Sequence, residues 1–227
     1  MLSIVDRGEA YEPDLTRYLT NQLHEGLRFV DVGANEGWFT LLAASRVGTT
    51  GKVHAFEPNP RVATKLRENV AINGFADRVT VHECALGASE GRATIYAPPD
   101  DGQASLVTRS GHPIDVPIRT LDTELMGEKI NLIKIDAEGV EDLVLKGGVR
   151  LISENKPTIA FEYSPYLLFL RGRDYDRAFT VLRGMGYCFA LTGSDGCLGR
   201  RIKSYKDLEP RVTMVIAQPK DKGVATE

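Results

Sequence analysis

A pair of glycines follows the first apolar run of the chain. Residues 27–32 form a run too short for a helix and typical of a strand buried on both faces. The run leads directly into Gly33, and Gly37 opens the segment behind it. Without a Cβ, glycine lets the backbone turn sharply or approach a ligand closely. The pattern predicts either a ligand-binding turn at the carboxyl edge of a sheet or a tight strand-to-helix turn without a ligand.

An acidic residue stands where the next predicted strand ends. Glu57 follows Gly37 by about 20 residues, the spacing at which sheets of this kind place a carboxylate on ribose hydroxyls. A carboxylate accepts hydrogen bonds from both vicinal hydroxyls, so we expect Glu57 to bind the ribose of a nucleoside cofactor. A solvated glutamate at a strand end is the alternative, and the coincidence with the glycine turn argues against it.

The charge of the turn bears on which cofactor it would bind. The turn lacks the dinucleotide fingerprint G-x-G-x-x-G, because Asn35 stands where the second glycine would let the backbone approach a pyrophosphate. Asp31 would repel a phosphate but suits a cationic ligand. S-adenosylmethionine carries a ribose, an ammonium and a sulfonium and no phosphate. Asp31 and Glu57 therefore favour S-adenosylmethionine over a nicotinamide dinucleotide.

Further carboxylates follow the later predicted strands. Asp136 and Glu138 come directly after the fourth strand, and Glu162 ends the fifth. A carboxylate near an acceptor hydroxyl would serve as general base in a methyl transfer, which otherwise needs close approach and alignment. The same three carboxylates could instead hold a divalent metal that lowers the pKa of the hydroxyl. Capping of the following helix is a third interpretation, which we prefer only for Glu141 and Asp142.

Alternating strands and helices would bring these side chains to one edge of a sheet. Repeated strand–helix–strand units imply a parallel sheet with right-handed crossovers. The last two strands have a short connection around 193–196, which suits an antiparallel hairpin. We predict strands at 27–32, 52–56, 79–82, 130–135, 158–161, 187–191 and 213–217, and helices at 38–47, 60–73, 140–146 and 174–185.

Five short motifs are spread over the part of the chain from about Leu27 to about Tyr163. They are D-V-G-A-N-x-G from Asp31 to Gly37, A-F-E-P from Ala55 to Pro58, N-V-A-I-N-G from Asn69 to Gly74, A-L-G from Ala85 to Gly87, and I-K-I-D-A-E-G-V-E from Ile133 to Glu141. Together they resemble the FkbM family of S-adenosylmethionine-dependent methyltransferases. The resemblance implies a Rossmann-like class I methyltransferase fold of the α/β class. Such a fold has a seven-stranded, mostly parallel sheet with its last strand antiparallel and helices on both faces.

The resemblance also implies an activity and a set of cofactor-binding residues. The activity is O-methylation of a hydroxyl on a sugar, a glycolipid or a polyketide-type natural product. Many class I methyltransferases carry an aspartate at the adenine, where this chain has Glu83-Cys84-Ala85, so backbone contacts would replace that side chain. The implied residues are Asp31, Gly33, Ala34, Asn35 and Gly37 at the methionine end, Glu57 and Pro58 at the ribose, and Ala85 and Leu86 at the adenine.

Composition limits the class of protein. With 227 residues and a formal net charge of -3, the chain fits one soluble domain and not a strongly basic nucleic-acid binder. Three widely spaced cysteines without a CxxC pair favour a reducing compartment. We therefore expect a cytoplasmic protein without a signal peptide or a membrane span, whose partner is a small-molecule hydroxyl acceptor and not a nucleic acid.

The chain divides into three predicted parts. Residues 1–26 would be a helical extension, 27–217 the methyltransferase domain, and 218–227 a polar tail. The extension has Leu15, Tyr18, Leu19 and Leu23 at helical spacing. Within the domain, residues of about 92–125 break the rhythm of strands and helices. Beyond a strand at 92–96 we expect an irregular loop there that helps to form the substrate side of the site.

Other residues and other functions stay open at this point. His112 is an alternative acid–base residue. Several basic residues in irregular segments could bind an anionic acceptor, namely Arg109, Arg171, Arg173, Arg200, Arg201 and Lys203. An NAD-type oxidoreductase would share the sheet and Glu57, and a non-catalytic module that binds S-adenosylmethionine would share the whole cofactor site.

Overall fold

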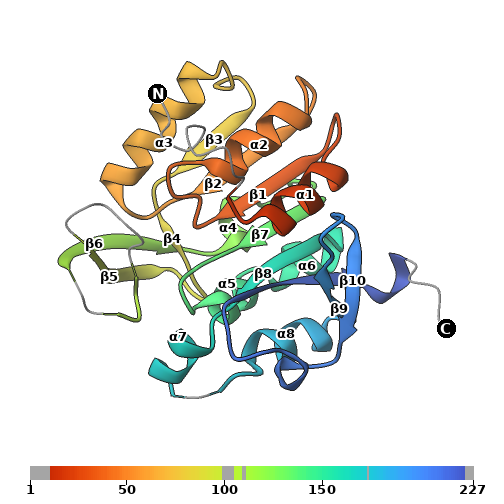
Figure 1. The fold of residues 1–227 in the computed structure, drawn as a ribbon. Helices are drawn as coiled ribbons and strands as arrows, with labels where there is room; N and C mark the ends of the chain where they lie inside the picture. Colours follow the sequence, from red (N-terminus) through yellow and green to blue (C-terminus); the bar gives the residue numbers. More distant parts are fainter. Residues whose placement is uncertain (1–10, 99–104, 109–110, 173, 223–227) are drawn as a thin grey trace.

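An eight-stranded sheet forms the centre of the molecule. The computed structural model describes residues 11–98, 105–108, 111–172 and 174–222, and its sheet has the order β10-β9-β11-β8-β7-β1-β2-β3 (Figure 1). The strands from β8 to β3 in this order are parallel, and β11, β9 and β10 each run antiparallel to a neighbour. The strands are β1 Arg28–Val32, β2 Lys52–Phe56, β3 Val79–His82, β7 Leu132–Ile135, β8 Thr158–Tyr163, β9 Tyr187–Thr192, β10 Leu198–Ile202 and β11 Thr213–Pro219.

Helices cover both faces of this sheet, because alternate strand residues point to opposite sides. Phe29 and Val53 belong to the apolar cluster under α1 and α2, whereas Val30 and Ile133 belong to the cluster under α5, α6 and α8. A third cluster joins α3 to the face that carries α2. The helices are α1 Pro13–Gln22, α2 Trp38–Arg46, α3 Pro60–Ile72, α4 Leu121–Glu124, α5 Glu141–Lys146, α6 Val149–Asn155, α7 Pro165–Leu170 and α8 Arg177–Gly184, with short 3-10 turns at Tyr205–Asp207 and Lys220–Lys222.

The α/β class, the parallel centre and the antiparallel end of the sheet are confirmed, but the predicted strand count is not. The turn at 193–196 leads into β10, which pairs with β9 and adds an eighth strand at the edge. Most of β10 is exposed, with Ile202 as its buried residue. An exposed edge strand needs no apolar alternation, so the sequence pattern did not reveal it.

A second, three-stranded sheet occupies part of the region at about 92–125 where we expected an irregular insertion, and residues 99–104 and 109–110 of that region lie outside the described part of the chain. Its order is β4-β6-β5, from β4 Ala85–Leu86, β5 Gly91–Ala97 and β6 His112–Arg119, and it projects from the side of the main sheet (Figure 1). The strand predicted at 92–96 is confirmed within β5. β6 contains Pro113 and Pro117, which argued against a strand. Because β4 pairs only with Ile118 and Arg119, most of β6 has one open edge, where proline is tolerated.

The two ends of the described chain pack on the main sheet. Leu15, Tyr18 and Leu19 of α1 are buried, which confirms the predicted amphipathic helix. The polar tail predicted from 218 begins too early, because Gln218 and Pro219 pair with β9 as the last residues of β11. Residues 223–227 lie outside the described part. Among the described residues, no helix has the length and apolar character needed to cross a membrane.

Candidate functional site

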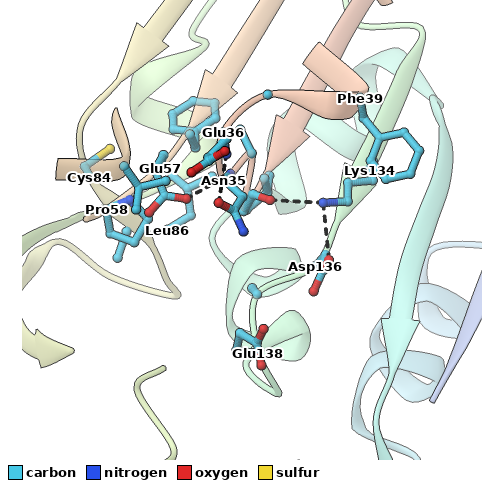
Figure 2. Close-up of a pocket in the computed structure, with 18 of the residues that line it drawn as sticks. Asn35, Glu36, Phe39, Glu57, Pro58, Cys84, Leu86, Lys134, Asp136 and Glu138 are labelled. Atoms are coloured by element: carbon cyan, nitrogen blue, oxygen red, sulfur yellow. Dashed lines mark hydrogen bonds and ion pairs between the residues drawn. The ribbon is translucent and has the colours of Figure 1, made fainter. Parts of the chain in front are cut away.

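A cavity of about 590 Å³ lies at the carboxyl ends of β1, β2 and β7. Parallel strands present these ends at one edge of the sheet, where open α/β sheets bind ligands. All of the predicted site residues except Asp31 and Glu162 line this cavity, and Figure 2 shows several of them. The lining residues that the sequence indicated are Gly33, Ala34, Asn35, Gly37, Glu57, Pro58, Ala85, Leu86, Asp136 and Glu138.

The glycine turn between β1 and α2 is held by its neighbours in the fold. Gly33, Asn35 and Gly37 have φ values of 71°, 50° and 102°, in the region that favours glycine. A Cβ on Gly33 would collide with the carbonyl oxygen of Asp136, and one on Gly37 would lie 2.5 Å from a methyl group of Leu66. Gly33 is therefore required by close packing against backbone, and Gly37 is favoured by its backbone conformation, whether or not a ligand is bound.

The Glu57 carboxylate is fixed by the backbone at the end of β2. Its Oε1 accepts a hydrogen bond from the Asn59 N–H at 2.8 Å, and its Oε2 accepts one from the Asn35 N–H at 3.0 Å. Burial raises the pKa of Glu57 to about 7, although both backbone donors oppose the rise. Each carboxylate oxygen keeps a second lone pair, so two ligand hydroxyls can still be accepted.

A buried lysine that the sequence analysis did not single out lies between the turn after β1 and the loop after β7, and both of these segments line the cavity. The Lys134 side chain is 3% exposed, and its Nζ donates to the Gly33 carbonyl oxygen at 3.0 Å. The same Nζ lies 3.5 Å from Asp31 Oδ1 and 3.4 Å from Asp136 Oδ2, and Figure 2 shows it between the turn and Asp136. Burial by itself lowers the pKa of Lys134, but Asp136 and Asp31 outweigh it and hold the pKa above its usual value. One signal was available: a lysine inside a strand that is otherwise apolar must find charged partners.

Asp31 does not reach the cavity. Its side chain is fully buried, and its Oδ2 accepts a hydrogen bond from the Thr40 hydroxyl at 2.7 Å. Its Oδ1 has no hydrogen-bond partner among the described residues and faces the Lys134 ammonium. Its negative charge is therefore compensated by the Lys134 ammonium inside the protein, and Asp31 itself does not line the cavity.

The acidic side chains after β7 and β8 lie in different environments. Burial raises the pKa of Glu138 to about 7, and the Asp136 charge adds to the rise. Burial raises the pKa of Glu162 to about 9, again with Asp136 adding to it, so Glu162 holds a proton at neutral pH. Glu141, the first residue of α5, accepts hydrogen bonds from the Ala137 and Gly139 N–H groups at 3.1 and 3.0 Å, so its role is structural, but it holds the preceding loop and does not cap the helix as predicted.

The other end of the cavity is apolar. Cys84, Ala85 and Leu86 line it behind β3, and Phe56 and Val62 join them. Burial raises the pKa of the Cys84 thiol to about 12, so this cysteine remains a neutral apolar group.

Two further walls come from the segment before α1 and from the insertion at about 92–125. Tyr11, before α1, lines the cavity beside Trp38, and their ring centroids are 6.3 Å apart. Ile95 of β5 and Leu106 supply the wall on the side of the small sheet, so the insertion contributes to the cavity as the sequence predicted. The contribution of Tyr11 could not be predicted from local patterns, because it depends on how distant elements pack.

The predicted alternative acid–base and anion-binding residues that the structure describes do not line the cavity. His112 is exposed at the start of β6. Arg171 contacts the Gly139 carbonyl oxygen and pairs with Asp142 at 2.7 Å, which supports the loop before α5. Arg109 and Arg173 lie outside the described residues. The remaining basic candidates are in or next to β10 and do not line the cavity, namely Arg200, Arg201 and Lys203.

The carboxylates after β7 do not fit a divalent metal. In the described part of the chain, no group of three or more His, Cys, Asp or Glu side chains is arranged to hold a metal ion. The Lys134 ammonium, 3.4 Å from Asp136, already supplies the positive charge at this position and would repel a cation there.

Two curated proteins resemble parts of the chain. The 2-O-methyltransferase NoeI of Sinorhizobium fredii is 29% identical over 161 residues, which are 62% of this chain and 64% of that protein. The hexuronic acid methyltransferase AglP of Haloferax volcanii is 31% identical over 143 residues, 60% of this chain and 56% of that protein. The chain thus spans less than two thirds of the length of either relative.

A solved structure and a family model also match the chain. The crystal structure of methyltransferase FkbM from Methylobacillus flagellatus shares the fold, with a TM-score of 0.56 and 22% identity over 85% of this chain and 43% of that one. Residues 31–189 match the model of the methyltransferase FkbM domain, and this range holds the glycine turn, Glu57 and the carboxylates after β7. The match to a methyltransferase family model argues against the alternative that the chain is an NAD-type oxidoreductase. The chain belongs to the FkbM methyltransferase family.

Proposed function

We propose that the chain is an S-adenosylmethionine-dependent O-methyltransferase that acts on a hydroxyl of a sugar, a glycolipid or a polyketide-type natural product. One observation carries the proposal. A single cavity is lined by a backbone-anchored carboxylate, Glu57, and by an unanchored carboxylate, Glu138, whose pKa is raised to about 7. Glu57 is suited to accept hydrogen bonds from the hydroxyls of a ribose, and Glu138 is suited to accept the proton of an acceptor hydroxyl.

The residues at the cofactor end fit S-adenosylmethionine. Glu57 has lone pairs left for the two ribose hydroxyls, and the apolar walls at Cys84 and Leu86 suit an adenine ring. The turn from Gly33 to Gly37 would hold the methionine end. When bound, S-adenosylmethionine supplies an electrophilic methyl group. Asp31, which does not line the cavity, would contribute through its ion pair with Lys134 and not by direct contact.

Glu138 is the best-placed general base among the predicted catalytic residues. It lines the cavity, and a pKa of about 7 lets it accept a proton near neutral pH. Asp136 also lines the cavity but is paired with Lys134. Glu162 is already protonated at neutral pH and would act as a neutral hydrogen-bonding group. In this assignment Glu138 takes the proton of the acceptor hydroxyl, and Asp136 and Glu162 shape its surroundings.

The names of the relatives support a small sugar-like acceptor. NoeI is a 2-O-methyltransferase and AglP a hexuronic acid methyltransferase. The formal net charge of -3 does not favour a nucleic-acid acceptor. The described cysteines are free thiols, which suits the cytoplasmic location that we propose.

Turnover with a panel of acceptors tests the proposal. The purified chain is incubated with S-adenosylmethionine and neutral hexosides, uronic acids or polyketide alcohols, and mass spectrometry follows S-adenosylhomocysteine and the methylated product. We expect product from at least one hydroxyl acceptor, and about 100-fold slower turnover in Glu138→Gln with unchanged cofactor affinity. Binding of the cofactor without product from any acceptor would indicate a non-catalytic module instead.

A further inference from the structure

Lys134 is buried in the centre of the site although its strand is otherwise apolar. The other residues of β7 are Leu132, Ile133 and Ile135, and all four side chains are buried. Its Nζ lies 5.4 Å from the centre of the Phe39 ring, so aromatic as well as polar groups surround it. Removing an ammonium from water is costly unless it is fully paired, so the site must compensate this charge.

The partners of Lys134 belong to two different parts of the cavity. The Gly33 carbonyl oxygen, 3.0 Å from Nζ, belongs to the turn at the proposed cofactor end. Asp136, 3.4 Å from Nζ, begins the loop that carries Glu138 at the proposed acceptor end. The two segments also touch directly, because the Gly33 Cα packs against the Asp136 carbonyl. The ammonium therefore spans the junction of the two loops.

We propose that Lys134 is a positioning residue, whose ammonium fixes the Gly33 turn against the Asp136 loop and so sets the cofactor end and the acceptor end in one arrangement. This inference rests on the proposed function, since it assigns these two ends to cofactor and acceptor. Asp31 of β1 is the third partner of Lys134. Its carboxylate contacts the ammonium but does not line the cavity.

The charge of Lys134 also acts on the carboxyls around it. It favours their ionised forms and opposes the effect of burial at both ends of the cavity. The groups that interact with it come from the segment before α1, from β1, from the end of β2 and from the loop after β7, and they are Tyr11, Glu12, Asp31, Glu57, Asp136 and Glu138.

Binding of S-adenosylhomocysteine by calorimetry tests the inference without an acceptor. Affinity is measured from about pH 5.5 to about pH 8.5 for the wild type, Lys134→Met and Lys134→Arg. In the wild type, affinity should rise through about pH 7 as Glu57 ionises. In Lys134→Met we expect at least about tenfold weaker binding, and a midpoint about half a pH unit higher. Lys134→Arg keeps the charge and should keep the wild-type midpoint.

Two further variants make the test specific. Lys52→Met removes a lysine from β2 that donates to the Asp77 carbonyl oxygen at 2.9 Å, and it should bind like the wild type. If Lys134→Met alone does not fold, the double variant with Asp31→Asn removes one buried charge of each sign. It should show the same loss of affinity with a smaller shift of the midpoint, because Asp31 raises the pKa of Glu57 whereas Lys134 lowers it.

Each result has a definite meaning. Wild-type affinity in Lys134→Met, or weaker affinity with an unchanged midpoint, would overturn the inference, because packing alone would then explain the residue. A shifted midpoint that Lys134→Arg restores would support it. Failure of the wild type to bind S-adenosylhomocysteine would contradict the proposed function itself and is therefore distinguishable from failure of the inference.

Discussion

The acidic side chains in and beside the cavity differ in which groups stabilise their negative charge, and this difference distinguishes their roles. Glu57 accepts two backbone hydrogen bonds, and Asp136 faces the Lys134 ammonium. Glu138 sits at a positive φ of 55° and has a pKa raised to about 7 by burial. Glu162, with a pKa raised to about 9, remains neutral. Glu57 and Glu138 both line the cavity and titrate near neutral pH, but Glu57 already accepts two backbone hydrogen bonds, so Glu138 is the carboxyl that better suits proton transfer from an acceptor.

The pH dependence of turnover follows from the Glu138 carboxyl. Its raised pKa means that the ionised, proton-accepting form becomes populated as pH increases through about 7. We therefore expect kcat/KM for the acceptor hydroxyl to increase with pH, with an apparent pKa near 7. We expect this pH dependence to be lost in Glu138→Gln. A rate that stays constant between about pH 6 and about pH 8 would assign the proton transfer to another group.

Sequence reasoning located a cavity residue where its spacing along the chain fixes its position, and it failed where partners come from distant strands. Glu57 was predicted because its distance from the glycine turn fixes its place in the fold. Lys134 was not, because its partners Asp31 and Asp136 meet it only after β1 and β7 pair. The assignment of Asp31 to the cofactor from charge alone likewise took no account of this internal counterion.

At the scale of elements, the site is built where the turn after β1 meets the loop after β7. The two strands pair in parallel from Phe29↔Leu132 to Val32↔Ile135, so the segments that follow them run side by side. The Asp136 N–H donates to the Val32 carbonyl oxygen at 3.1 Å and continues this pairing beyond the strands. Gly33 is the residue at which this contact leaves no room for a side chain.

A comparison of two glycine substitutions tests this packing. Gly33 and Gly74 have nearly the same φ, 71° and 73°, but no heavy atom lies within 4 Å of a Cβ built on Gly74. Gly74→Ala should lower the free energy of unfolding by about 1–2 kcal/mol through backbone strain alone. Gly33→Ala should cost at least about twice as much in urea unfolding, because it also displaces the Asp136 carbonyl. Equal costs would show that the contact is unimportant.

Two strands that the sequence did not predict share a physical cause. β10 is an exposed edge strand, and β6 contains two prolines that its open edge tolerates. Both depend on which strand lies beside them and not on their own periodicity. The buried strands β1, β2 and β7 had clear apolar runs, and these are the strands that carry the site.

At the scale of the whole molecule, one cavity combines parts from several regions of the described chain, all of which precede α5. The main sheet supplies the glycine turn and the carboxylates, the small sheet supplies Ile95, and the segment before α1 supplies Tyr11. Helices cover both faces of the main sheet (Figure 1), and polar groups line the cavity at its carboxyl edge. The N-terminal segment and the small sheet are therefore the regions in which we expect acceptor preference to be determined.

Calorimetric titration with S-adenosylmethionine tests the proposed function most directly. We predict binding of one molecule per chain, competition by S-adenosylhomocysteine, no binding of NAD, and at least about tenfold weaker binding in Glu57→Ala, because the ribose loses its paired acceptor. Absence of binding, preference for NAD, or unchanged affinity in Glu57→Ala would contradict the assignment of this cavity as the cofactor site.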